Sequence, residues 1–77
     1  MNKQRRQDLS EVIDLLDDAI TRLGEIRDEE QDAFDNLPEG LQCTERGEKM
    51  QDAIDAMDEV ESDIQDVQSK VQDIISA

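Results

Sequence analysis

Carboxylates are the reactive groups that this sequence supplies in quantity, and they recur at a fixed spacing. Eight of them form two rows with a spacing of seven residues: Glu11, Asp18, Glu25 and Asp32, then Asp52, Glu59, Asp66 and Asp73. Seven residues are about two turns of an α-helix, so each row lies along one side of a helix with about 10 Å between neighbours. Two interpretations stay open for the rows: a solvated helix face, or a surface that binds a basic protein.

The groups that would turn these carboxylates into a catalytic or metal site are missing. The chain has no histidine, which excludes a Glu-x-x-His di-iron motif. Cys43 is the only cysteine and has no His or second Cys with which to form an activated thiolate or a metal site. The acids lack the Asp/Asn alternation and central Gly of an EF-hand loop. We therefore expect no catalytic residues, no metal, no cofactor and no enzyme activity.

The charge balance limits the kinds of partner. Asp and Glu number 22 against 8 Lys and Arg, and the formal charge of −14 is spread over both halves of the chain. Such a surface repels phosphate and anionic lipid, so we expect neither direct nucleic-acid binding nor membrane docking. Two copies side by side would carry −28 along a rod of ~45 Å. That density is close to the ~1.7 Å per charge of duplex DNA, so DNA mimicry is the sharper form of the binding hypothesis.

We expect no membrane span and no signal peptide. No apolar run approaches the roughly 18 residues of a membrane span. The charged N-terminus is not followed by the apolar core of a signal peptide. The expected location is the cytoplasm.

The first half of the chain has the apolar periodicity of an amphipathic helix. Three rows with a spacing of seven share one side of it: Leu9, Leu16 and Leu23; Val12, Ala19, Ile26 and Ala33; and Ile13, Ile20 and Phe34, interrupted by Arg27. A stripe of three rows is wider than a coiled-coil seam and is typical of a helix in a bundle.

The second half has a stricter period of 3.5 residues, which is typical of a left-handed supercoil. Its two rows are Met50, Met57, Ile64 and Val71, and Ala53, Val60, Val67 and Ile74. Ile54 and Ile75 widen this stripe at its two ends.

The stretch DNLPEGLQCTERGEK, residues 35–49, separates the two patterns. Pro38 cannot continue a helix and disfavours helical geometry at the residue before it. We expect Asn36 to cap a short turn, with Glu39 as the reciprocal acid of a capping box. Thr44 is the candidate cap of the second helix.

These elements predict an all-α fold: a single antiparallel helical hairpin over residues 1–77. The first helix runs from about 3 to 35, the corner over 36–44, and the second helix from about 45 to 76. Two helices cannot cover a three-row stripe, so we expect a homodimer that forms a four-helix bundle. The alternative is that an unrelated partner covers it.

Residues 27–60, RDEEQDAFDNLPEGLQCTERGEKMQDAIDAMDEV, resemble small acidic helical proteins of unknown function encoded in phages and mobile elements of Firmicutes and gut bacteria. The resemblance lies in EEQ, DNLPEGLQ and ERGEKMQDAID. It implies a phage or prophage context in a bacterial host, and it assigns no catalytic residue.

Two functions are favoured over a third, weaker one, in which an oligomer holds a small ligand between its helices and Arg22, Arg27 and Arg46 are the only candidates to hold phosphate. The first is an accessory or inhibitory protein whose acidic rows engage a basic host or phage protein, such as a nuclease or another DNA-binding factor. The alternative is a structural protein that self-assembles into a helical bundle, with acids that only solubilise it.

Overall fold

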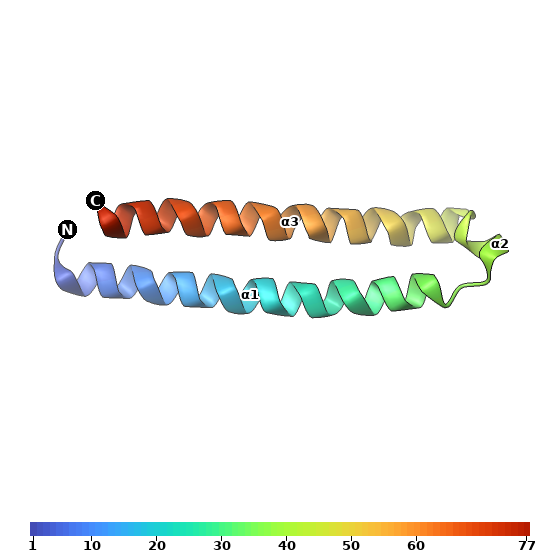
Figure 1. Ribbon diagram of the computed structural model, residues 1–77, viewed down its shortest axis with the longest axis horizontal. Helices are drawn as coiled ribbons and strands as arrows, with labels where there is room; N and C mark the ends of the chain where they lie inside the picture. Colours follow the sequence, from blue (N-terminus) through green and yellow to red (C-terminus); the bar gives the residue numbers. More distant parts are fainter.

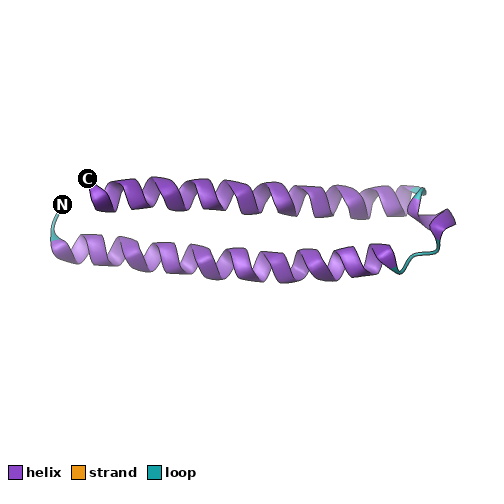
Figure 2. Cartoon of the chain, in the orientation of Figure 1, coloured by secondary structure: helices purple, strands orange, loops and turns teal.

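The computed structural model describes all 77 residues and shows a two-helix hairpin. Helix α1 (Lys3–Asp35) and helix α3 (Glu45–Ser76) run antiparallel, and the four-residue helix α2 (Glu39–Gln42) forms the corner between them (Figure 1). Strands are absent (Figure 2). The molecule is a narrow rod of 59 × 15 × 12 Å with both termini at the end opposite the corner. The predicted all-α hairpin and the bounds of its two long helices are confirmed.

Helix α1 ends at the predicted place, just before the corner segment, but the residue that caps the corner turn differs from the predicted one. Asn36 keeps a helical backbone and its N–H donates to the Asp32 carbonyl at 3.0 Å. The prediction that Asn36 caps the corner turn is therefore wrong. Pro38 takes the capping position instead, with φ −54° and ψ 142°, and its carbonyl accepts the N–H of Leu41 at 2.8 Å. Pro38 suits this position because its ring fixes φ near the observed value.

The corner is fastened to the ends of both long helices. The Gln42 side-chain amide donates to the carbonyls of Phe34 and Leu37 at 3.2 and 3.3 Å. Thr44 is the N-terminal cap residue of α3, as predicted, but its hydroxyl donates backward to the Leu41 carbonyl instead of accepting from α3. Gly47 is buried directly against Gln42: a Cβ at this position would lie 2.6 and 2.8 Å from the Gln42 carbonyl carbon and Cα. Only glycine fits where α3 leaves the corner.

The seam, defined as the residues with which α1 and α3 face each other, forms a thin core. Ile54 is 1% exposed and is the only buried large apolar side chain. The other apolar seam residues are half-buried: Leu9, Ile13, Leu16, Ile20, Leu23 and Phe34 on α1, and Met50, Met57, Ile64, Val71 and Ile75 on α3. Polar residues interrupt the seam at four half-buried positions: Arg27, Glu30, Glu61 and Gln68. A hairpin with so little burial gains limited hydrophobic stabilisation by itself.

Candidate interaction surfaces

Polar contacts join the two helices along one side of the hairpin. Arg27 donates from Nε and one terminal nitrogen to the two oxygens of Asp58, at 2.8 and 3.4 Å. The Gln68 amide donates to Asp17 Oδ1 at 2.7 Å and to the Ile13 carbonyl at 3.3 Å. The hydrogen bond to Asp58 and then its charge raise the pKa of the Arg27 guanidinium above its ordinary value. These contacts fix the register and satisfy two of the polar seam residues.

We call this the polar side. Its residues each follow a seam residue by one position: Asp17, Gly24 and Gln31 on α1, and Gln51, Asp58, Gln65 and Gln72 on α3. None of them is a large apolar residue. The polar side therefore presents hydrogen-bonding groups to water or to a partner and carries no row of large apolar side chains.

The other side of the seam is apolar and uncovered. Its residues each precede a seam residue by one position: Val12, Ala19, Ile26 and Ala33 on α1, and Ala53, Val60, Val67 and Ile74 on α3. In two antiparallel right-handed helices, residues that precede the seam lie on the same side of the pair, so the two rows form one surface, the apolar side. Its five large side chains are 40–46% exposed. Because the hairpin covers only about half of each, this surface can accept a further helix layer.

Charge is distributed unevenly around the apolar side. Arg5 and Arg46 continue its two rows at either end. We call the positions three residues after each member of the two rows the rim. The rim holds Arg22, Lys49 and Lys70, together with Leu15, which is 67% exposed. The same positions hold three acids, Asp8, Glu29 and Asp63. The rows and rim together hold five bases and three acids, so this side is less acidic than the rest of a chain of net charge −14. Two of these bases, Arg22 and Lys49, are paired with Glu25 and Glu45.

The two acidic rows lie on the outer edges of the hairpin, away from the seam. All eight carboxylates are exposed, and only Glu25 is paired, with Arg22 at 3.1 Å. Because α1 and α3 face each other, their outer edges point in opposite directions, and one hairpin cannot present both rows to a single partner surface. Two copies would carry −28 over the 59 Å rod, about 2.1 Å per charge, which is sparser than the ~1.7 Å of duplex DNA.

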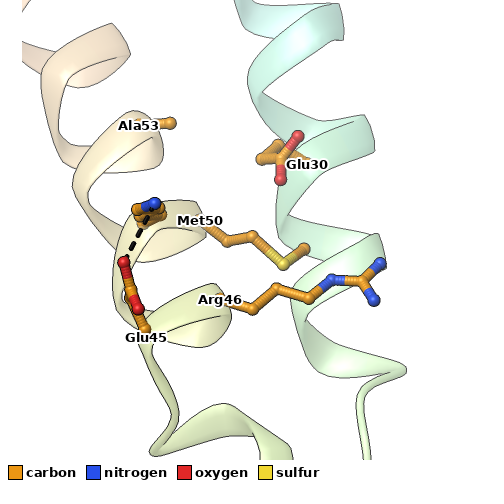
Figure 3. Close-up of a pocket in the computed structure, with 6 residues that line it drawn as sticks. Glu30, Glu45, Arg46, Met50 and Ala53 are labelled. Atoms are coloured by element: carbon orange, nitrogen blue, oxygen red, sulfur yellow. Dashed lines mark ion pairs between the residues drawn. The ribbon is translucent and has the colours of Figure 1, made fainter.

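A hollow of about 550 Å³ opens at the corner end of the apolar side. Figure 3 shows Arg46 and Met50 reaching from α3 toward α1, near Glu30, while Glu45 and Lys49 form an ion pair of 3.1 Å on α3. Ala53 also lines it. Since Arg46 and Ala53 belong to one row of the apolar side, the hollow is a part of that surface.

Three further features concern metal binding, the thiol and the membrane. No group of three or more His, Cys, Asp or Glu side chains is placed to hold a metal ion. Cys43 is exposed at the end of α2. Neither long helix carries a stretch apolar enough to cross a bilayer.

The structure separates apolar rows that the sequence analysis grouped together. The predicted oligomer or core stripe divides in two: Met50, Met57, Ile64 and Val71 lie in the seam, and Val60, Val67 and Ile74 lie on the apolar side. On α1, Val12 and Ile26 likewise lie outside the seam.

The bases on the rim of the apolar side were not predicted from the sequence. A signal for them exists, because Lys49 and Lys70 are 21 residues apart, a multiple of seven, and so share one line along the helix.

The chain matches no protein-family model, no characterised protein and no solved structure.

Proposed function

We propose that this protein is a non-enzymatic interaction protein that pairs with a second copy through its apolar side and carries its acidic rows on the outside of the resulting four-helix bundle. The contrast between the two sides of the hairpin supports this proposal. One side is closed by the Arg27–Asp58 and Gln68–Asp17 contacts, and the other leaves five large aliphatic side chains about half exposed.

Self-association is favoured because a single hairpin leaves the large side chains of its apolar side partly exposed. Fully burying a Val, Leu or Ile side chain contributes about 1.5–3 kcal/mol. Covering the exposed 40–46% of each large side chain on the apolar side therefore recovers on the order of 1 kcal/mol per side chain. A second copy gains the same stabilisation on its own apolar side. Bases outnumber acids in the rows and rim taken together, which reduces the repulsion that a net charge of −14 would otherwise cause.

A matched pair of substitutions on α3 tests the self-association. Val60→Asp adds one negative charge on the apolar side, and Gln65→Asp adds the same charge on the polar side, where the residue is exposed. Size-exclusion chromatography with light scattering should give a dimer for the wild type and for Gln65→Asp. Val60→Asp should give a monomer, because pairing would bury its charge without a partner. A monomeric wild-type protein, or equal behaviour of the two variants, would contradict the proposal.

The second part of the proposal is that the acidic rows engage a basic protein. Seven of the eight row carboxylates are unpaired in the hairpin, so they are available to Lys and Arg of a partner. Stacking two hairpins through their apolar sides brings an outer edge of one copy next to an outer edge of the other. The bundle would then carry two rows side by side on each flank, separated by about one interhelical distance of 8–10 Å. Nucleases and other DNA-binding proteins of host or phage are candidate partners, because proteins that bind DNA carry basic surfaces that attract a dense array of carboxylates.

Capture experiments from bacterial lysate test this second part. Electrostatic binding predicts capture at low ionic strength and release at high ionic strength. The triple variant Glu59→Gln, Asp66→Gln, Asp73→Gln should remain a dimer and lose the captured protein. A partner retained at high salt and by the triple variant would show that the rows do not form the contact.

A further inference from the structure

Arg22 and Asp63 occupy matching places on the two rims of the apolar side. Arg22 comes five residues before Arg27, and Asp63 comes five residues after its partner Asp58. Because α1 and α3 are antiparallel, the two residues lie at the same height along the rod. Both are exposed. Arg22 is paired with Glu25 of its own helix at 3.1 Å, and Asp63 has no partner within its own chain.

This height is also the midpoint of the apolar side. Arg22 is ten residues after Val12 and eleven before Ala33. Asp63 is ten residues after Ala53 and eleven before Ile74. Any stacking that overlaps two apolar sides completely therefore brings the middle of one copy, with its Arg22 and Asp63, against the middle of the other.

Two symmetric arrangements bury the apolar side against a second copy, since homodimers are related by a two-fold axis. In the first, the axis runs along the rod, both corners lie at the same end, and each α1 packs on the α3 of the other copy. In the second, the axis runs across the rod, the corners lie at opposite ends, and each helix packs on its own counterpart.

The charges at the midpoint distinguish the two arrangements. With corners at the same end, Arg22 meets the Asp63 of the other copy, and this pair forms twice. With corners at opposite ends, Arg22 meets Arg22 and Asp63 meets Asp63. Like charges placed opposite each other at an interface are unfavourable, and opposite charges fix the register.

The most exposed aliphatic residue gives a second, independent indication. Leu15 comes two residues before Asp17, and Lys70 comes two after Gln68, which bonds to Asp17, so these rim residues also share one height. With corners at the same end, the aliphatic stem of Lys70 covers the Leu15 of the other copy while its ammonium stays in water. With corners at opposite ends, each α1 packs on the α1 of the other copy. Leu15 comes seven residues before Arg22 and Glu29 comes seven residues after it, so Leu15 of one copy meets Glu29 of the other.

We infer that the docking surface for a second copy is the apolar side with its rim, and that the two hairpins stack with their corners at the same end, joined across the interface by reciprocal Arg22–Asp63 pairs. This inference rests on the self-association proposed above. It makes the bundle all-antiparallel between neighbouring helices, with all four termini at one end.

The single native cysteine measures the orientation directly. Cys43 is exposed at the corner, so a spin label attached to it in the wild-type dimer reports the distance between the two corners. Corners at the same end give a distance of about 20 Å, two interhelical spacings. Corners at opposite ends give a distance near the 59 Å length of the rod, and that result would overturn the inference while leaving the dimer intact. A protein that is monomeric at labelling concentrations would overturn the proposed self-association itself.

Charge reversal tests the pair itself. Arg22→Glu and Asp63→Arg should each weaken the dimer about tenfold, because each change disrupts two surface ion pairs and replaces them with repulsion. The double variant should return to within about threefold of the wild-type dissociation constant. Asp66→Arg makes the same charge change one turn further on, on the outer edge, and should not rescue Arg22→Glu. Rescue by Asp66→Arg, or none by Asp63→Arg, would refute the pairing.

Discussion

Two glycine-to-alanine substitutions should have opposite effects on stability. Gly24 lies on the polar side of α1, and a Cβ at this position would have no heavy atom within 4 Å. Alanine is favoured over glycine within a helix by about 1 kcal/mol. We therefore expect Gly24→Ala to raise the melting temperature by roughly 4–8 °C, the shift that 1 kcal/mol produces in a domain of this size.

Gly47→Ala should be destabilising although it makes the same change of residue type within a helix. Its Cβ would overlap the backbone of Gln42, and a backbone clash cannot be relieved by rotating a side chain. Overpacking of this kind typically costs about 1–3 kcal/mol. Moving Gln42 would also disturb its bonds to the Phe34 and Leu37 carbonyls, each of which contributes about 0.5–1.5 kcal/mol. The clash therefore outweighs the helix propensity, and we expect a net loss of about 1–3 kcal/mol.

Thermal unfolding followed by circular dichroism measures both changes. The samples must share one protein concentration, because association makes the melting temperature depend on concentration. The expected order of melting temperatures is Gly24→Ala, wild type, Gly47→Ala. A Gly47→Ala protein that melts at or above the wild type would refute the close approach of α3 to the corner. A Gly24→Ala protein that melts below the wild type would refute the open position on α1.

Two further predictions concern charge. Raising the sodium chloride concentration should tighten the dimer, because salt screens the repulsion between two chains of net charge −14 with a Debye length of about 10 Å at 0.1 M. Sedimentation equilibrium measures this, and weaker association at high salt would mean that the Arg22–Asp63 pairs outweigh the net repulsion. The triple variant Glu59→Gln, Asp66→Gln, Asp73→Gln should keep the helical content and melting temperature of the wild type. A marked loss of either would show that these carboxylates stabilise the fold.

The hairpin was predictable from local signals. Pro38 interrupts two long amphipathic patterns, and the residues on either side of it support helices strongly enough that their bounds, 3–35 and 45–76, agree with the structure. The details of the corner were less accessible. Asn36 is a favourable cap residue, but the helical hydrogen bond to the Asp32 carbonyl holds its backbone in α1, and Pro38 adopts the extended geometry by itself.

The composition of the seam was harder to predict than the helices. On α3 the row of Ala53, Val60, Val67 and Ile74 is entirely apolar, so hydrophobicity favours it over the row of Ile54, Glu61, Gln68 and Ile75. The structure places the second row in the seam, where Gln68 donates across to Asp17. Such contacts between helices exist only once the antiparallel register is set. Periodicity within one helix carries no information about such contacts. For the same reason the sequence could assign the acidic rows to outward positions but not to opposite edges.

Ile54 is the only aliphatic side chain that a single hairpin buries. Folding of the protein should therefore depend on its concentration in the cell. If most of the burial comes from a second copy, then the folded fraction depends on how much protein the cell makes, as for any dimer whose monomer is weakly stable. Below the dissociation constant, newly made chains would open often and be exposed to proteases. Above it, the same chains would persist. The dissociation constant would then act as an expression threshold, so that only sustained synthesis allows the protein to accumulate.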